Sequence, residues 1–288
     1  MQSWGLTDPG RVRTQNQDTY QIEQLDRNTT LCIVCDGMGG AKSGNVASCL
    51  AVDVFVEEVR RTWNADMDAE DIEQMLRGAV KLANFTVFDQ AQQLEEFSGM
   101  GTTLVAALVQ SREVTVVNVG DSRAYRVNRD GIKRITTDHS LVQMMVDRGE
   151  LTPEMARTYP GKNYITRAIG TEPVMDCDVF HLRVERGDCV LLCSDGLSNM
   201  MDDQEILFEV GHGVNKQYCC QRLLDIAKNR GAPDNVTSVL VLICPRREKG
   251  VIGLWINILD GCWTTAMKYW RSSAPAAWLW CTRPAAIG

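Results

Sequence analysis

The run Leu31-Cys-Ile-Val-Cys-Asp-Gly-Met-Gly-Gly40 is an apolar, strand-like stretch that ends abruptly in Asp-Gly. A second run, Cys189-Val-Leu-Leu-Cys-Ser-Asp-Gly-Leu197, has the same design far along the chain. A third acid, Asp234, lies just before another apolar run, 236–244. Strand ends that bring carboxylates together from distant segments build sites for hard cations, because Mg²⁺ and Mn²⁺ prefer oxygen ligands. The three acids therefore predict a metal site at the ends of buried strands.

The acids of these runs, Asp36, Asp195 and Asp234, would repel one another if they met without a cation. Two unit charges about 4 Å apart cost about 4 kcal/mol at an effective dielectric constant of about 20. Any one of these acids alone is commonly an ordinary loop residue, but the three together favour the metal interpretation. Gly37 also allows a backbone carbonyl to approach as a further ligand. Two Mg²⁺ or Mn²⁺ ions sharing a carboxylate would generate hydroxide at neutral pH and clamp a phosphoryl group.

Two further segments carry groups suited to phosphate and metal chemistry. In the run 10–18, Arg13 offers a planar fork that matches phosphate, and Asp18 can accept hydrogen bonds from metal-bound water. A solvated loop is the alternative for this run. Asp121, in the turn-like Gly120-Asp-Ser-Arg123, is either an additional metal ligand or part of an ordinary tight turn.

Composition excludes several classes of protein. The chain has 288 residues, of which 44% are hydrophobic and 23% charged, as in ordinary globular proteins. Its net charge of −7 argues against a nucleic-acid partner. Cys32 and Cys35 would lie on opposite faces of a strand, so a reduced chain is expected and a zinc site is not. We expect no signal peptide and no membrane-spanning helix, and hence a cytoplasmic location.

The composition changes near residue 245, which predicts a boundary between a domain over 1–245 and a tail over 246–288. The tail holds five of the seven Trp residues, and its six Lys and Arg against two acids give it a net charge of +4. From Ile252 onward its apolar residues have helical spacing. The tail is either an amphipathic helix that docks on an anionic membrane or a partner, or a segment that folds back or stays unordered.

Periodicity predicts both long helices and strands. Helical spacing follows the Gly-rich loop at Val46, Leu50 and Val54, and a second helix is expected over 68–94. The three runs 102–109, 114–119 and 123–127 are expected to form consecutive antiparallel strands. Further strands are expected over 180–184, 189–193 and 236–243, and shorter helices over 141–148, 153–157, 205–210 and 216–228. Because strands and helices do not strictly alternate, antiparallel sheets with outer helices are favoured over a doubly wound parallel sheet.

Six motifs in order resemble the metal-dependent Ser/Thr protein phosphatases of type 2C, in their compact bacterial form. These motifs lie at 10–18, 36–40, 99–103, 119–123, 194–197 and 234–237, and the similarity covers about residues 4–244. The resemblance implies an α+β fold, a four-layer α-β-β-α sandwich of two antiparallel sheets flanked by helices. It also implies a small flap over about residues 140–171, beside a cleft that holds two metal ions.

The resemblance further assigns residues to the metals, which would be Mn²⁺ or Mg²⁺. Asp36 would bridge both ions, and the Gly37 carbonyl would bind one of them. Asp195 and Asp234 would complete the second site. Asp121, together with Asp195, resembles the ligands of a weaker third-metal site in bacterial members.

Arg13 would hold the substrate phosphate, and Asp18 would orient metal-bound water. The chain departs from the family pattern at two positions. Gln17 stands where many members have an acid, and Met38 stands where animal members have a His that could donate a proton. The leaving alkoxide would then take its proton from water or another group. His139 is expected to be an ordinary structural or surface residue, as is His181.

The implied reaction is direct attack of a metal-activated water on phosphoserine or phosphothreonine. Phosphorylated Ser/Thr proteins would be the substrates, and a cognate Ser/Thr kinase in a signalling pathway would be opposed. A monomer is expected. The alternative is a catalytically weak module of the same fold that binds phosphoproteins, and a weaker alternative is a hydrolase of small phosphoesters.

Overall fold

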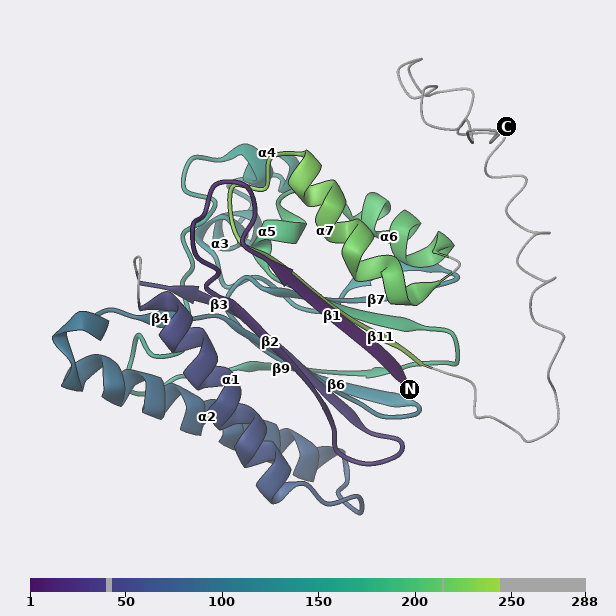
Figure 1. The fold of residues 1–288 in the computed structure, drawn as a ribbon, viewed down its shortest axis with the longest axis horizontal. Coiled ribbons are helices and arrows are strands. Elements are labelled where there is room, and N and C mark those ends of the chain that lie inside the picture. The colour runs from purple at the N-terminus through teal and green to yellow at the C-terminus, as the bar shows by residue number, and fades with distance from the viewer. Residues whose placement is uncertain (40–42, 214, 244–288) are drawn as a thin grey trace, which may run out of the picture. The chain divides into compact units, whose positions relative to one another are not determined.

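The computed structural model describes residues 1–39, 43–213 and 215–243 (Figure 1). All described elements belong to Met1–Pro245, the first of two units into which the chain divides. The helix expected in the tail 246–288, and its membrane or partner contact, lie outside the described residues. Over the described ranges, each helix is too short or too polar to cross a membrane.

Two antiparallel sheets form the centre of the fold. The first sheet has the order β1 (Gln2–Asp8), β11 (Val236–Leu242), β10 (Cys189–Cys193), β7 (Arg123–Asn128) and β8 (Gly131–Arg134). The second has the order β2 (Asp18–Gln24), β3 (Thr30–Met38), β5 (Leu104–Val109), β6 (Glu113–Val119) and β9 (Asp178–Arg183). The short β4 (Gly101–Thr102) pairs with the end of β3.

Helices cover the outer face of each sheet, as Figure 1 shows. The second sheet is covered by α1 (Gly44–Thr62) and α2 (Ala69–Gln93), and the first by α6 (Asp203–His212) and α7 (Cys219–Asn229). Shorter elements complete the described fold: η1 (Glu95–Phe97), α3 (Leu141–Asp147), α4 (Pro153–Thr158), α5 (Asp195–Ser198) and η2 (Lys216–Tyr218). The predicted α+β sandwich of two antiparallel sheets flanked by helices is confirmed.

Strand β3 shows how the sequence pattern produces the layers. Leu31, Ile33 and Cys35 are buried against α1 and α2, whereas Cys32 and Val34 are buried between the two sheets. Alternate side chains of a strand point to opposite faces, so a continuously apolar run has both faces covered. The two thiols therefore lie on opposite faces, as the spacing predicts.

One expectation about strand order is wrong. The strands β5 and β6 pair with each other, but β7 leaves their sheet and pairs with β10 and β8 in the other sheet. The crossing occurs at Gly120, whose φ of +106° is a backbone conformation that favours glycine. This turn therefore carries Asp121 from one sheet to the other, at the end of the sandwich where the motifs meet.

The strands β1 and β2 were not expected from the sequence. Most of their residues are only partly buried, and β2 has just two large apolar side chains among polar ones, Tyr20 and Ile22. Weak alternation of this kind does not distinguish an edge strand from a loop. The consequence for the site is that Asp18 begins a strand and does not lie in a loop.

Candidate active site

Asp18 and Asp36 lie directly opposite each other on the neighbouring strands β2 and β3. The Asp18 side chain is buried, with 6% of the residue exposed. Its Oδ2 accepts hydrogen bonds from Ser194 Oγ at 2.7 Å and from Thr237 Oγ1 at 2.6 Å. Because Thr237 belongs to β11 of the other sheet and Ser194 directly follows β10, Asp18 connects the two sheets at the place where the acids gather.

Asp195 and Asp234 approach from the first sheet. Asp195 begins α5 directly after β10, and Asp234 lies two residues before β11, the strand that pairs with β10. A side chain at Gly196 would place its Cβ 1.9 Å from the carbonyl oxygen of Asn235, so only glycine permits this approach. The Asp-Gly signature at the end of β10 thus serves close packing between the two acid-bearing loops.

Thr103 fixes the backbone of Asp36. The Asp36 N–H donates to Thr103 Oγ1 at 2.9 Å, and the Thr103 N–H donates to the Asp36 carbonyl at 2.9 Å. The Thr103 hydroxyl also lies 2.7 Å from Ser122 Oγ, next to Asp121 in the chain. One threonine therefore links Asp36 to the turn that carries Asp121.

The converging carboxyls strongly affect one another's protonation. Burial, followed by the charges of its four neighbouring acids, raises the pKa of Asp36 well above its usual value. Burial first and then the charge of Asp195 raise the pKa of Asp121 to about 8. Burial also raises the pKa of Asp18 to about 7, and burial followed by the charge of Asp234 raises the pKa of Asp195. Without a cation, this cluster holds protons that isolated carboxylates would lose.

The donor set fits divalent cations of the hard class. The acids Asp36, Asp121, Asp195 and Asp234 line one cavity of about 590 Å³, and Gly37 lines it with them. Within the described ranges, the buried Oδ1 atoms of Asp18 and Asp195 have no hydrogen-bond partner. Among the residues in those ranges, no three His, Cys, Asp or Glu side chains are placed as a group that could hold a metal ion. A cation bound here would therefore take part of its shell from water or backbone oxygen, as Mg²⁺ commonly does.

Arg13 lies at the rim of the same cavity, where its Nη2 donates to Asp234 Oδ2 at 2.9 Å. The loop that carries it is held by Asn235, whose Nδ2 donates to the carbonyls of Pro9 and Gln15 at 3.0 and 2.9 Å. Asn235 Oδ1 also accepts the backbone N–H of Gln17 at 2.9 Å. The residue next to Asp234 thus positions the arginine.

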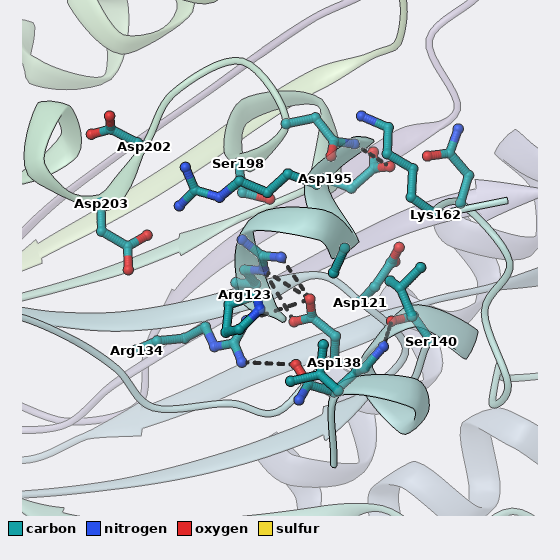
Figure 2. Close-up of a pocket in the computed structure, with 18 of the residues that line it drawn as sticks. Asp121, Arg123, Arg134, Asp138, Ser140, Lys162, Asp195, Ser198, Asp202 and Asp203 are labelled. Atoms are coloured by element: carbon teal, nitrogen blue, oxygen red, sulfur yellow. Dashed lines mark hydrogen bonds and ion pairs between the residues drawn. The ribbon is translucent and has the colours of Figure 1, made fainter. Parts of the chain in front are cut away.

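A second cavity of about 610 Å³ shares Asp121 and Asp195 with the first. Figure 2 shows Arg123 and Arg134 pointing toward Asp138 within this cavity. The two nitrogens of Arg123 that face Asp138 donate to its carboxylate at 3.0 and 2.6 Å, and Arg134 Nη1 lies 3.5 Å from it. The segment with α3 and α4 forms part of the wall, and one isolated bridge joins its two ends, Ser140 and Ile165.

Sequence reasoning missed the residues that hold the acids in place, namely Thr103, Ser194, Asn235 and Thr237. The signal available was their position, since each stands within three residues of a predicted acid or inside a Gly-rich motif. Hydroxyl and amide side chains beside a strand end are common in turns, however, so their long-range partners could not be read from the sequence. All seven predicted site residues line the cavity or, in the case of Asp18, lie buried beside Asp36.

A cluster of oxygen donors beside an arginine, at one end of a two-sheet sandwich, is the arrangement expected of a metal-dependent phosphoester hydrolase. Residues 11–225 match the family model of protein phosphatase 2C, and the chain belongs to this family. The predicted resemblance is thereby confirmed, and the protein is a serine/threonine phosphatase of the 2C type.

The relatives agree with this assignment. The serine/threonine phosphatase stp of Listeria welshimeri is 36% identical over 235 residues, which cover 82% of this chain and 93% of the relative. The crystal structure of the phosphatase Stp1 from Staphylococcus aureus matches with a TM-score of 0.77 and 37% identity, over 83% of this chain and 94% of that one. A structure of the PstP catalytic domain, which contains two manganese ions, matches with a TM-score of 0.71 and 32% identity, over 83% and 96% of the chains.

Proposed function

We propose that this phosphatase hydrolyses phosphoserine and phosphothreonine at a two-metal centre, and that it opposes a protein Ser/Thr kinase. The observation that carries the proposal is the convergence of Asp36, Asp195 and Asp234 in one cavity, with Arg13 as the one arginine among the residues that line it. The positive charge of one guanidinium cannot neutralise these three carboxylates and the fourth carboxylate, that of Asp121. The remaining charge favours divalent cations as resident cofactors, Mn²⁺ or Mg²⁺.

Each residue has a proposed role. Asp36 would contact both ions, Gly37 would contribute its carbonyl, and Asp195 and Asp234 would hold the second ion. Asp121 with Asp195 would hold a third, weaker one. Ions held by these residues would supply an activated water and would neutralise charge on the phosphoryl oxygens.

Arg13 would bind the substrate phosphate. Its Nη2 already donates to Asp234, and the remaining donors of the guanidinium fork are left for phosphoryl oxygens. Asp18 would orient a water through Oδ1, because its Oδ2 is occupied by Ser194 and Thr237. Met38 lines the cavity but has no proton to donate, so solvent would protonate the leaving alkoxide.

Hydrolysis of an aryl phosphate with and without Mn²⁺ tests the proposal. We expect turnover to require Mn²⁺ and to be lost in Asp195→Asn. The matched control is Asp203→Asn, which removes an acid from the neighbouring cavity and leaves the cluster intact. Metal-independent turnover, or full activity in Asp195→Asn, would contradict the two-metal centre. Phosphopeptide binding without turnover in any metal would favour the regulatory module instead.

The proposed substrates are phosphorylated proteins of the cytoplasm, on which the enzyme acts as a monomer. A comparison of phosphopeptides with small phosphorylated metabolites tests this assignment of substrates. A kcat/KM that is higher for the peptides is expected. Equal or higher values for the metabolites would exclude a dedicated protein phosphatase.

A further inference from the structure

His139 lies buried at the point where the segment with α3 and α4 leaves the sandwich. Only 7% of the residue is exposed. Its Nδ1 accepts the backbone N–H of Gly120 at 3.1 Å, and its Nε2 lies 3.1 Å from Asp178 Oδ2. Because Nδ1 is an acceptor, the neutral ring carries its proton on Nε2 and donates it to Asp178. Both ring nitrogens are therefore occupied, which leaves neither for proton transfer to a substrate.

The backbone of His139 connects the same parts of the molecule. Its N–H donates to the Gly120 carbonyl at 2.9 Å, and its carbonyl accepts the N–H of Thr166 at 2.8 Å. On the returning side of the segment, Arg167 Nη1 donates to Asp178 Oδ1 at 3.0 Å. One histidine thus contacts the turn between β6 and β7, and both ends of segment 140–166.

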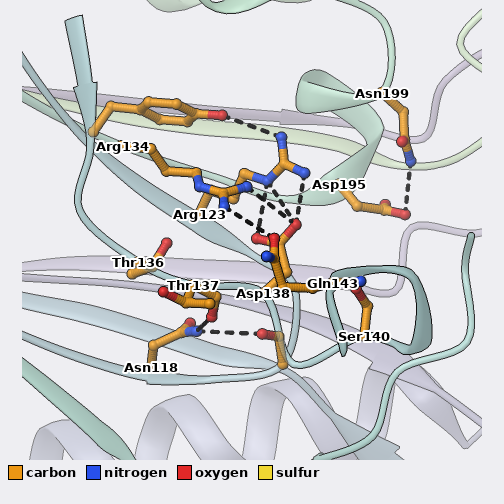
Figure 3. Close-up of polar contacts among 12 residues, drawn as sticks. Asn118, Arg123, Arg134, Thr136, Thr137, Asp138, Ser140, Gln143, Asp195 and Asn199 are labelled. Carbon is orange, nitrogen blue, oxygen red and sulfur yellow. Dashed lines mark hydrogen bonds and ion pairs between the residues drawn. The ribbon is translucent and has the colours of Figure 1, made fainter. Parts of the chain in front are cut away.

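The turn that His139 holds is the one that carries Asp121. Asn118 Nδ2 donates to the carbonyls of Gly120 and Thr137, both at 3.2 Å. Figure 3 shows the Asn118 amide beside Thr137, joined to it by a dashed line. A Cβ at Gly120 would lie 2.6 Å from Thr103 Cγ2, so the turn has little room to shift. Any displacement of Gly120 moves Asp121, which lines both cavities.

We propose that His139 is a positioning residue for the metal centre. With Asp178 and Arg167 it forms a latch that fastens both ends of segment 140–166 to the Gly120–Asp121 turn. The latch fixes the direction of the Asp121 carboxylate, and with it the affinity for the most weakly held cation. This inference rests on the proposed function, in which Asp121 binds a cation.

Two substitutions separate the contacts of the ring. In His139→Asn, the amide oxygen takes the place of Nδ1 and keeps an acceptor for Gly120. In His139→Gln, the amide nitrogen takes the place of Nε2 and keeps only the contact with Asp178. Groups that orient metal ligands typically contribute on the order of 10- to 100-fold to metal affinity. We therefore expect weak-site Mn²⁺ affinity to fall by about that factor in His139→Gln and to be largely retained in His139→Asn.

Mn²⁺ titration calorimetry without substrate measures this affinity, and hydrogen exchange of residues 140–166 reports the latch. His181→Gln is the matched control, because His181 also pairs with an acid, Glu73 at 2.9 Å, but is 44% exposed. We expect His181→Gln to bind Mn²⁺ and exchange hydrogen as the wild type does, and His139→Gln to exchange faster over 140–166.

Asp121→Asn distinguishes failure of the latch from failure of the proposed function. If Asp121→Asn loses the weak site while His139→Gln binds Mn²⁺ as the wild type does, the latch is overturned and the metal assignment stands. If Asp121→Asn itself binds Mn²⁺ like the wild type, the assignment of Asp121 fails, and the positioning role fails with it. Equal losses in His139→Asn and His139→Gln would also overturn the role of the Gly120 contact.

Discussion

Two neighbouring groups of acids in this phosphatase have opposite electrostatic surroundings. Asp138 is 8% exposed at its side chain, accepts hydrogen bonds from Arg123 and lies 3.5 Å from Arg134 (Figure 3). Burial lowers the pKa of Arg123, but the charge of Asp138, the hydrogen bonds to it and the contact with Tyr125 together raise that pKa above its usual value. Asp36 and Asp121 meet mainly other carboxylates, and burial together with those charges raises their pKa values.

This difference indicates the role of each group of acids. The charge of Asp138 is neutralised by arginines of the protein itself, and the role of this acid is to hold β7 to the segment that follows β8. Asp36 and Asp121 lack enough cationic side chains nearby to neutralise their cluster. Each deprotonation in the cluster therefore makes the next one less favourable. Burial alone does not separate the two cases. The identity of the neighbouring charges does, and the four predictions below test that distinction.

Asp36→Asn should have the largest effect. Asp36 is the one acid with a neighbour from each acid-bearing segment, so its loss should impair both proposed metal positions. The loss of several kcal/mol of transition-state stabilisation corresponds to a fall in kcat/KM on the order of 10³-fold. Aryl phosphate hydrolysis at saturating Mn²⁺ measures it, with Asp203→Asn as control. A fall of less than about tenfold would place Asp36 outside the catalytic centre.

Asp138→Asn should act on stability and not on metal binding. Removal of one partner from a buried ion pair destabilises a protein by about 3 kcal/mol or more, because the other charge stays buried. For a domain of this size, that corresponds to a fall in Tm of about 6 to 12 °C. The loss should be the same with EDTA and with Mn²⁺. If the Mn²⁺-induced rise in Tm disappears in this variant, Asp138 belongs to the metal site.

Arg13→Ala should have a smaller, purely functional effect. A hydrogen bond to a charged group contributes about 1.5 to 3 kcal/mol, so kcat/KM should fall about 10- to 100-fold. The Tm should stay near that of the wild type, because Arg13 is half-exposed at the rim and its one ion pair there is weak. Steady-state kinetics with a phosphopeptide measures the effect. Unchanged kinetics would remove Arg13 from the phosphate site.

The fourth prediction is a pH dependence of the cation-free protein. The pKa values of Asp18 and Asp121 in the fold are about 7 and 8, above the ordinary value of 3.8, so the folded state binds more protons. The associated stability is present below about pH 4 and is lost as the pH rises through 7 and 8. Melting in EDTA between pH 5 and 9 should show a falling Tm. A Tm that rises with pH would mean that these acids are already neutralised.

The sequence was most informative where physical constraints are local. Continuous apolar runs predicted β3 and β10, and the 3.6-residue spacing predicted α1 and α2. The Asp-Gly pairs at the ends of β3 and β10 predicted where the carboxylates would lie. From the local sequence, Asp121 could be either part of a tight turn or a metal ligand. The fold shows that the same residues form the turn and line the cavity.

The contacts that assemble the site could not be predicted in this way. Ser194 and Thr237 reach Asp18 across 176 and 219 positions of the chain. Such hydrogen bonds follow from the stacking of two sheets, which no local window of sequence contains. The crossing of β7 into the other sheet has the same origin, because both sheets accept an antiparallel strand with that pattern.

The central claim is that the acid cluster needs cations which the chain does not supply. Melting of the wild type and of Asp36→Asn at pH 8, each in EDTA and in Mn²⁺, tests it most directly. We expect Mn²⁺ to raise the wild-type Tm, since a ligand at 100 times its Kd stabilises the folded state by about 2.7 kcal/mol. We also expect Asp36→Asn to melt above the wild type in EDTA and to gain little from Mn²⁺. A wild type that is indifferent to Mn²⁺, or an Asp36→Asn that melts below it in EDTA, would contradict the account.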